Sequence, residues 1–314
     1  MPTTNPLGVS QRTFLARATQ VEKEYLRLFP NVNFSYDVRP NLIARAAWYT
    51  SVGRPNFNQY AGGVTLPDPD LPPAANNRIT VNNAGIKAWS AETTKVRLEY
   101  YFEGVGQISV GAFERKIENF FGSTVFASTP EFLALYDLDP AQYGAFDVST
   151  QYNINGVVKT TGLEFDYKQA LTFLPRWARG VQVFANASAL RVTGDETANL
   201  AGYVPRVYNW GVSLNREKFN LRANWNYRGK SRQGPVTGRG IEPGTFTWMS
   251  KQLYLDLQGD YILTRRLTLF ANLRNVGDAT NDSQIIGPST PEHAQFRQRT
   301  TYGSLWSFGI KGSF

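Results

Sequence analysis

The sequence predicts an all-β fold, an antiparallel transmembrane β-barrel built from about eleven strands. Three observations carry this prediction. Apolar and polar residues alternate with a period of two in segment after segment, as in strands whose two faces meet different surroundings. Short and long connections alternate between these segments, like the periplasmic turns and external loops of membrane barrels. Aromatic residues are plentiful, with 20 Phe, 16 Tyr and 7 Trp, while charged residues make up only 18% of the chain.

Residues 219–228 show the alternation most clearly. Apolar side chains occupy nearly every second position, and Asn or Arg occupies the positions between them. The length of this segment matches the ~9–11 residues that a tilted strand needs to cross a bilayer. We expect the apolar face of each strand to meet lipid and the polar face to line a water-filled lumen. The same pattern predicts strands at residues 25–36, 42–52, 93–102, 107–117, 157–169, 181–192, 203–215, 219–228, 251–262, 267–275 and 302–314.

The connections divide into two kinds, except that residues 170–180 are long for a periplasmic turn and residues 193–202 are short for an external loop. Those at residues 37–41, 103–106, 216–218 and 263–266 are short, and those at 54–92, 118–156, 229–250 and 277–300 are long. Long structureless connections are uncommon in compact soluble domains, which favours a membrane barrel. An odd number of strands places the two ends on opposite sides of the membrane, as in a chain cut within an external loop. We therefore divide the chain into residues 1–24, an N-terminal loop or partial strand, and residues 25–314, the C-terminal part of an outer-membrane β-barrel.

Composition argues against several other functions. The net charge is +8, but Lys and Arg are scattered along strands instead of forming a stripe, so nucleic-acid binding is not expected. Cys is absent and His293 is the single histidine, which excludes thiolate chemistry, a Ser-His-Asp triad and a histidine-based zinc site. We predict no catalytic residue, no metal site and no cofactor, and hence no enzyme. No apolar run approaches the ~18–20 residues of a spanning helix, and the first 20 residues lack the apolar core of a secretory signal peptide.

Two pairs of carboxylates have both a chemical and a structural interpretation. Glu164 and Asp166 lie on one face of a predicted strand, and paired carboxylates can do acid–base work. We favour the interpretation that they are lumen-facing charges near Lys168 and the arginines of neighbouring strands. Asp68 and Asp70 lie in the Pro-rich stretch at residues 66–73 and can offer oxygen ligands to Ca²⁺. We favour a solvated loop there.

The start of the first long loop is the candidate ligand-binding site. Binding residues concentrate in loops that a rigid scaffold presents. Arg54, Asn56, Phe57 and Tyr60 directly follow the second predicted strand. An arginine among aromatic rings suits anionic or aromatic ligands, and an interfacial aromatic belt would equally explain the presence of Phe57 and Tyr60.

The C-terminal residues resemble a known signal. Residues 307–314 read SFGIKGSF, which resembles the C-terminal segment by which outer-membrane barrels are recognised for insertion. That signal pairs a polar residue and a glycine with a terminal aromatic, here Ser307, Gly309 and Phe314. Gly312 departs from the pattern, because a larger apolar residue is usual there. The resemblance implies that the last strand binds the barrel-assembly machinery.

Four further segments match the sequence patterns of one protein family. Residues 29–36 (FPNVNFSY) resemble the strand opening LPSLNLKY, and residues 46–57 (AAWYTSVGRPNF) resemble the strand that ends in GRPNF. Residues 161–167 (TGLEFDY) resemble xGLEFDY, and residues 267–278 (LTLFANLRNVGD) resemble the penultimate strand LFANVRNLFD. In sequence, order and spacing, the four segments resemble TonB-dependent outer-membrane receptors. Residues 82–92 depart from the family, because the prolines of the usual GNPxLKPE are missing.

The resemblance implies a fold and a function. The chain would supply roughly half of a barrel of about 22 strands, and no part of it resembles the plug or the TonB box of the family. The parent protein would take up a scarce nutrient, such as a siderophore, cobalamin or an oligosaccharide, across the cell outer membrane. Its partners would be outer-membrane lipid and a TonB-type energy-coupling protein that binds the missing N-terminal region. Such a location requires a signal peptide upstream.

Two alternatives stay open at this point. One is a small, complete outer-membrane barrel that acts as a pore or a barrel enzyme. The other is a soluble all-β carbohydrate-binding module. Phe219, Leu221, Trp225 and Tyr227 distinguish these classes, since a soluble sandwich buries such side chains within protein and a barrel presents them to lipid.

Overall fold

The computed structural model describes residues 28–57, 63–74, 76–176, 178–194, 202–236, 240–242 and 244–312. The predicted N-terminal segment 1–24, the candidate ligand residue Tyr60 and the terminal Phe314 lie outside these residues.

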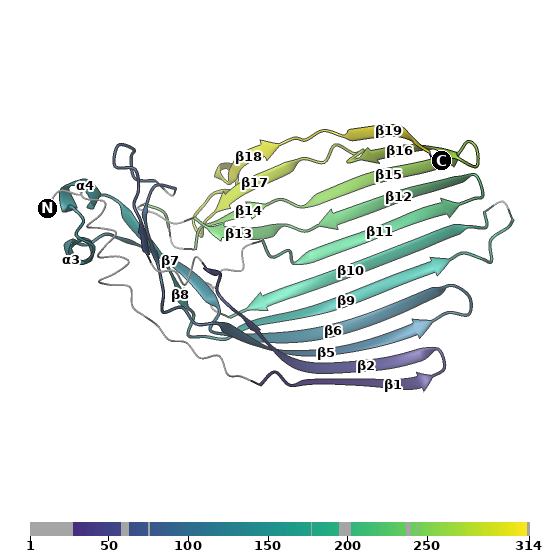
Figure 1. Ribbon diagram of the computed structural model, residues 1–314, viewed down its shortest axis with the longest axis horizontal. Helices are drawn as coiled ribbons and strands as arrows, with labels where there is room; N and C mark the ends of the chain where they lie inside the picture. Colours follow the sequence, from purple (N-terminus) through teal and green to yellow (C-terminus); the bar gives the residue numbers. More distant parts are fainter. Residues whose placement is uncertain are drawn as a thin grey trace.

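Eleven strands form one broad, curved antiparallel sheet, as predicted (Figure 1). Each strand pairs with the next one of the sheet along the chain, so the order is that of a meander with long insertions. Within the residues that the structure describes, the sheet is not closed, and β1 and β19 are its two edges. In sheet order the strands are β1 (Asn31–Arg39), β2 (Leu42–Gly53), β5 (Trp89–Tyr101), β6 (Gly106–Glu118), β9 (Val158–Ala170), β10 (Val181–Thr193), β11 (Arg206–Asn215), β12 (Phe219–Arg228), β15 (Gln252–Ile262), β16 (Leu267–Arg274) and β19 (Leu305–Gly312).

The ends of some strands differ from the prediction. The first strand was expected at 25–36, but β1 extends to Arg39 because a register shift between Asp37 and Arg39 keeps it paired with β2. The tight turn is therefore confined to residues 40–41. Strand β5 begins four residues before the predicted position 93, since its pairing with β2 continues to Gly53 opposite Trp89. The alternation changes phase between Ala91 and Val96, so the sequence pattern breaks there and the pairing with β2 extends the element.

The long connections contain secondary structure that the sequence pattern did not predict. One four-stranded sheet has the order β3-β4-β8-β7, and another has the order β13-β14-β17-β18. These strands are short and carry little periodic signal. Their bounds are β3 (Gly63–Thr65), β4 (Ile79–Asn82), β7 (Phe121–Ala127), β8 (Asp147–Asn153), β13 (Ser231–Pro235), β14 (Phe246–Met249), β17 (Asn281–Ile286) and β18 (Phe296–Thr300). Helices α3 (Pro130–Leu135) and α4 (Pro140–Tyr143) join β7 to β8, and the short helix η2 (Glu292–Ala294) precedes β18.

We call β3, β4, β7, β8, α3 and α4 the first external module, and β13, β14, β17 and β18 the second external module. Both lie at the same end of the large sheet, and the short turns lie at the opposite end (Figure 1). This arrangement is the alternation of long and short connections that the sequence predicted.

Apolar burial is distributed in an unusual way for a chain of this size. One buried cluster lies in the first external module and contains Ile79, Leu133, Leu138, Tyr143, Phe146 and Val148. A second, Ala91, Ile117, Ile154 and Val158, lies where that module meets the large sheet. In the large sheet itself, by contrast, Val96, Leu163 and Leu221 are 53%, 61% and 50% exposed. No second sheet of the described chain covers this apolar face, which fits a face solvated by lipid.

Candidate ligand-contacting site

The predicted ligand residues lie where β2 leaves the large sheet. Gly53, the last residue of β2, faces Trp89 in the paired strand β5. A Cβ atom at Gly53 would overlap the indole ring of Trp89, so the glycine allows the ring to lie across the strand. Pro55 is buried, while Arg54 and Asn56 are exposed and Phe57 is 82% exposed. The chain thus anchors a loop at Gly53 and Pro55 and presents the predicted residues Arg54, Asn56 and Phe57 to solvent.

The first external module joins two connections that are distant in sequence. Strand β4, from the connection after β2, pairs in parallel with β8, from the connection after β6. Ile79 lies opposite Val148 in this pair, and both side chains are fully buried. Full burial of side chains of this size stabilises by roughly 1.5–3 kcal/mol each. The two connections therefore form one folded unit instead of two independent loops.

Asparagine side chains strengthen this junction. The Asn153 amide donates to the carbonyl oxygens of Lys87 (2.8 Å) and Asn119 (2.8 Å), and its Oδ1 accepts from the Lys87 backbone N–H (2.7 Å). Asn83 donates to the Gln151 carbonyl at 2.9 Å. These bonds satisfy backbone groups that the short strands leave unpaired. Sequence reasoning missed both asparagines, because a structural amide in a loop carries no pattern of its own.

Basic and aromatic side chains come together in the second external module. Lys230 Nζ lies 5.3 Å from the centre of the Trp248 ring, and the Arg232 guanidinium lies 4.4 Å from the centre of the Phe246 ring. Arg232 and Trp248 are also direct partners across β13 and β14. Such cation–π pairs are worth about 0.5–1 kcal/mol at exposed sites. The alternate spacing of Lys230 with Arg232, and of Phe246 with Trp248, was the sequence signal that could have located this site.

Two carboxylates fix the outer part of the same module. Asp282 accepts two hydrogen bonds of 2.7 Å from the guanidinium of Arg299, its partner across β17 and β18. This bidentate contact lowers the pKa of the Asp282 carboxyl group. Glu242 accepts from the Ser289 hydroxyl at 2.7 Å and from the Ser289 backbone N–H at 2.9 Å, and these bonds lower the pKa of Glu242.

The polar face of the large sheet carries a chain of ion pairs that joins β2, β5 and β9. Arg45 contacts Glu99 at 3.1 Å, Glu99 contacts Arg97 at 3.5 Å, and Arg97 contacts Asp166 at 2.6 Å. Ser109, also bonded to Arg97, is buried. The Asp166 carboxylate is paired with an arginine of β5, two strands away across β6, which supports the structural interpretation of this residue over acid–base work. These side chains balance charge along a polar wall.

The Asp68 carboxylate accepts the backbone N–H of Asp70 at 3.0 Å, as in a local loop turn. Within the part of the chain that the structure describes, no three His, Cys, Asp or Glu side chains gather as a metal site would require.

Gly309 of the predicted insertion signal also has a packing role. It lies directly opposite Phe270 of β16, and a Cβ atom at Gly309 would lie 2.6 Å from the Phe270 ring. Lys311 Nζ is 5.0 Å from the centre of the same ring. Ser307 lies opposite Asn272 on the same face of the sheet.

The fold defines a class of protein, a membrane β-barrel wall with folded external modules. Among the described residues, no helix is long and apolar enough to cross a membrane. The family model "TonB dependent receptor-like, beta-barrel" matches residues 6–276. The chain therefore belongs to the TonB-dependent receptor family, whose members are outer-membrane receptors and transporters and not enzymes. Membership decides against a soluble carbohydrate-binding module.

Solved receptor structures have the same fold. The ferric enterobactin receptor PfeA of Pseudomonas aeruginosa (a G324V mutant) superimposes with a TM-score of 0.59 at 15% identity, over 91% of this chain and 40% of that one. The copper transporter OprC gives 0.58 at 14% identity, over 90% and 39%. P. aeruginosa FpvA bound to a heterologous pyoverdine gives 0.54 at 17% identity, over 92% and 33%. The chain thus spans about two fifths or less of these receptors. No curated protein matches it in sequence.

Proposed function

We propose that this chain forms the C-terminal barrel wall and part of the ligand-binding mouth of a receptor for energised nutrient uptake. Family membership over residues 6–276 is the observation that supports this proposal most strongly. The nutrient is scarce and too large or too dilute for a passive pore, as are siderophores, cobalamin and oligosaccharides. The names of similar structures add ferric enterobactin, ferric pyoverdine and copper as candidate classes.

The kinds of side chain exposed at the mouth support an anionic or aromatic ligand among these classes. Arg54, Asn56 and Phe57 are exposed on a loop whose base is fixed by the packing of Trp89 against Gly53. Tyr60 belongs to the same proposed site. A loop that is already held in place lowers the entropic cost of ligand binding.

The proposed partners follow from the same mechanism. A TonB-type protein supplies energy through the N-terminal region of the receptor, and the barrel-assembly machinery binds the last strand through Ser307, Gly309 and Phe314. Outer-membrane lipid solvates the apolar face. A signal peptide directs the protein to the cell outer membrane.

Uptake by cells tests the proposal. A strain that lacks the gene is compared with its parent for uptake of ferric siderophores, cobalamin, oligosaccharides and copper, each with and without a functional TonB-type protein. We expect the uptake of one nutrient to be lost both in the strain that lacks the gene and in the strain that lacks a functional TonB-type protein. Arg54→Ala and Phe57→Ala should then raise the KM for that nutrient, while Leu71→Ala, which alters a residue 55% exposed on the same connection, should not. Normal uptake of all four classes in the deletion strain would contradict the proposal.

A further inference from the structure

The apolar face of the large sheet changes character toward its external end. Residues that pair directly across strands point to the same face, so the pairing defines rows. One row contains Val96, Ala112, Leu163, Ala189 and Arg206. The next row outward contains Thr94, Glu114, Thr161 and Arg191, and the third contains Glu92, Lys116, Lys159 and Thr193. Within three rows the face thus passes from apolar to charged.

Aromatic pairs locate the membrane boundary near these rows. Tyr208, two residues from Arg206 on the same face of β11, stacks on Tyr227 at 5.3 Å between ring centres. Trp210 stacks on Trp225 at 6.2 Å in the following row. Tyrosine and tryptophan gather at the level of lipid headgroups in membrane proteins. Arg206 therefore stands just outside the aromatic belt, at the level of lipid phosphates.

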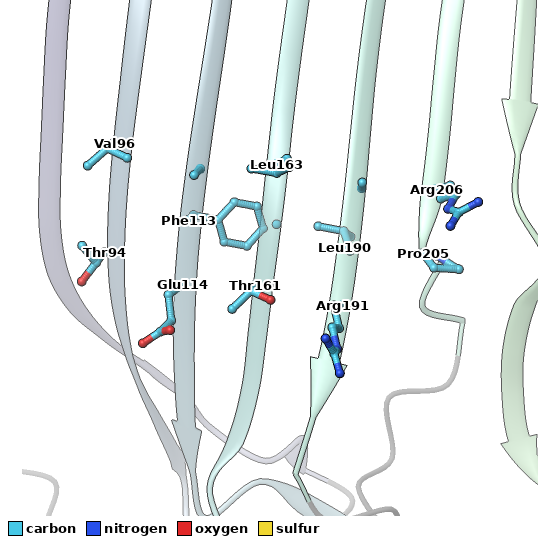
Figure 2. A pocket seen from close by; sticks show the side chains of 13 residues that line it. Thr94, Val96, Phe113, Glu114, Thr161, Leu163, Leu190, Arg191, Pro205 and Arg206 are labelled. Carbon is cyan, nitrogen blue, oxygen red and sulfur yellow. The ribbon is translucent and has the colours of Figure 1, made fainter.

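A groove lies at this boundary on the apolar face. It encloses about 640 Å³ and is lined by side chains from β5, β6, β9, β10 and β11 (Figure 2). Its floor is low because the side chains of Ala112 and Ala189, which point to this face on either side of Leu163, are small. Val96 and Leu163 form apolar walls, 53% and 61% exposed. An apolar floor that opens toward lipid is suited to an acyl chain.

The charges at the groove are unbalanced in favour of cations. Its carboxylate, Glu114, is already engaged by Lys116 at 3.3 Å and by Lys159. Arg191 and Arg206 are both exposed, and neither forms an ion pair with a carboxylate in the described ranges. In the three rows, four cations face two carboxylates, Glu92 and Glu114.

We infer that this groove binds a phosphate-bearing acylated lipid of the outer leaflet. Arg191 and Arg206 hold the phosphate, since guanidinium groups form paired hydrogen bonds with phosphate oxygens. An acyl chain lies along Val96, Ala112 and Leu163. The site lies on the lipid-facing side of the wall, opposite to the polar face, so it is separate from the nutrient path and does not depend on which nutrient is taken up.

Lipid binding to the whole protein, extracted from outer membranes in detergent, tests this inference. The probe is diphosphoryl lipid A, and bound lipid is measured by native mass spectrometry over a concentration series. Each cation near a lipid surface contributes enough for about a fivefold change in affinity, so the double variant Arg191→Gln/Arg206→Gln should bind about 30-fold more weakly. The matched control is Arg222→Gln, which removes an exposed arginine from the polar face of β12 and should leave the affinity unchanged.

Two further measurements separate the parts of the inference. Ala112→Phe fills the groove and retains both arginines, so it should also weaken lipid A binding, even if the double variant fails to fold. Free phosphate at 10 mM should not displace the lipid. The inference is overturned if neither groove variant weakens binding relative to Arg222→Gln, or if free phosphate competes, because the arginines would then hold a soluble anion.

Discussion

The joined connections of the first external module give the sharpest prediction. Ile79 belongs to the connection between β2 and β5, yet it packs with Leu133, Phe146 and Val148 of the connection between β6 and β9. Ile79→Ala removes three carbon atoms from a fully buried site. At ~0.8 kcal/mol per buried methylene, plus a cavity term, the module should lose about 3–4 kcal/mol of stability.

The loss should appear in the partner connection. A destabilisation of this size raises the open population of the module by about two orders of magnitude, since each ~1.4 kcal/mol is a factor of ten. We expect backbone amides of residues 130–150 to exchange with deuterium about 100-fold faster, as measured by mass spectrometry on the protein in detergent. The amides of β12, in the membrane wall, should be unaffected.

Leu71→Ala is the matched control, because Leu71 lies in the same connection as Ile79 but is 55% exposed. It should change exchange by less than about threefold, as surface substitutions usually do. If Ile79→Ala accelerated exchange only around residues 63–82 and left residues 130–150 protected, the two connections would fold independently and the reasoning would be refuted.

Three other predictions concern separate parts of the molecule. Gly309→Ala should displace the Phe270 ring and cost about 1–3 kcal/mol, measured as a lower urea midpoint of the inserted protein; an unchanged midpoint would mean that the ring has room to move. The Glu242 contact with Ser289 should persist above the ordinary glutamate pKa of about 4.3 and be lost as the pH falls below it through the lowered pKa of Glu242. Loss of protection of the Ser289 amide, measured against its intrinsic exchange rate at each pH and found only at acid pH, would show this, and Glu242→Gln should abolish the pH dependence. Finally, the chain expressed alone should aggregate or be degraded, because within the described residues β1 and β19 are open edges of the sheet, which lipid does not tolerate; recovery of a stable, soluble monomer would contradict this.

The sequence by itself determined the large sheet. Strands long enough to cross a bilayer repeat their alternation many times, so residues 219–228 coincide with β12 and residues 42–52 lie within β2. The assignment of faces followed from the same period, and Leu221 is exposed on the apolar side as predicted. Alternation is a local property, which is why a single sequence reveals it.

Tertiary structure alone decided what the long connections do. Strands β3 and β4 are three and four residues long, too short for a period to be recognised. The parallel pairing of Ile79 with Val148 joins positions far apart in the chain, and no local pattern specifies such a partner. The predicted site residues followed from their place after a strand, whereas the contact of Arg232 with the Phe246 ring depends on the register that pairs Arg232 with Trp248. Burial and register depend on neighbours that are distant in sequence, and only the folded chain brings those neighbours together.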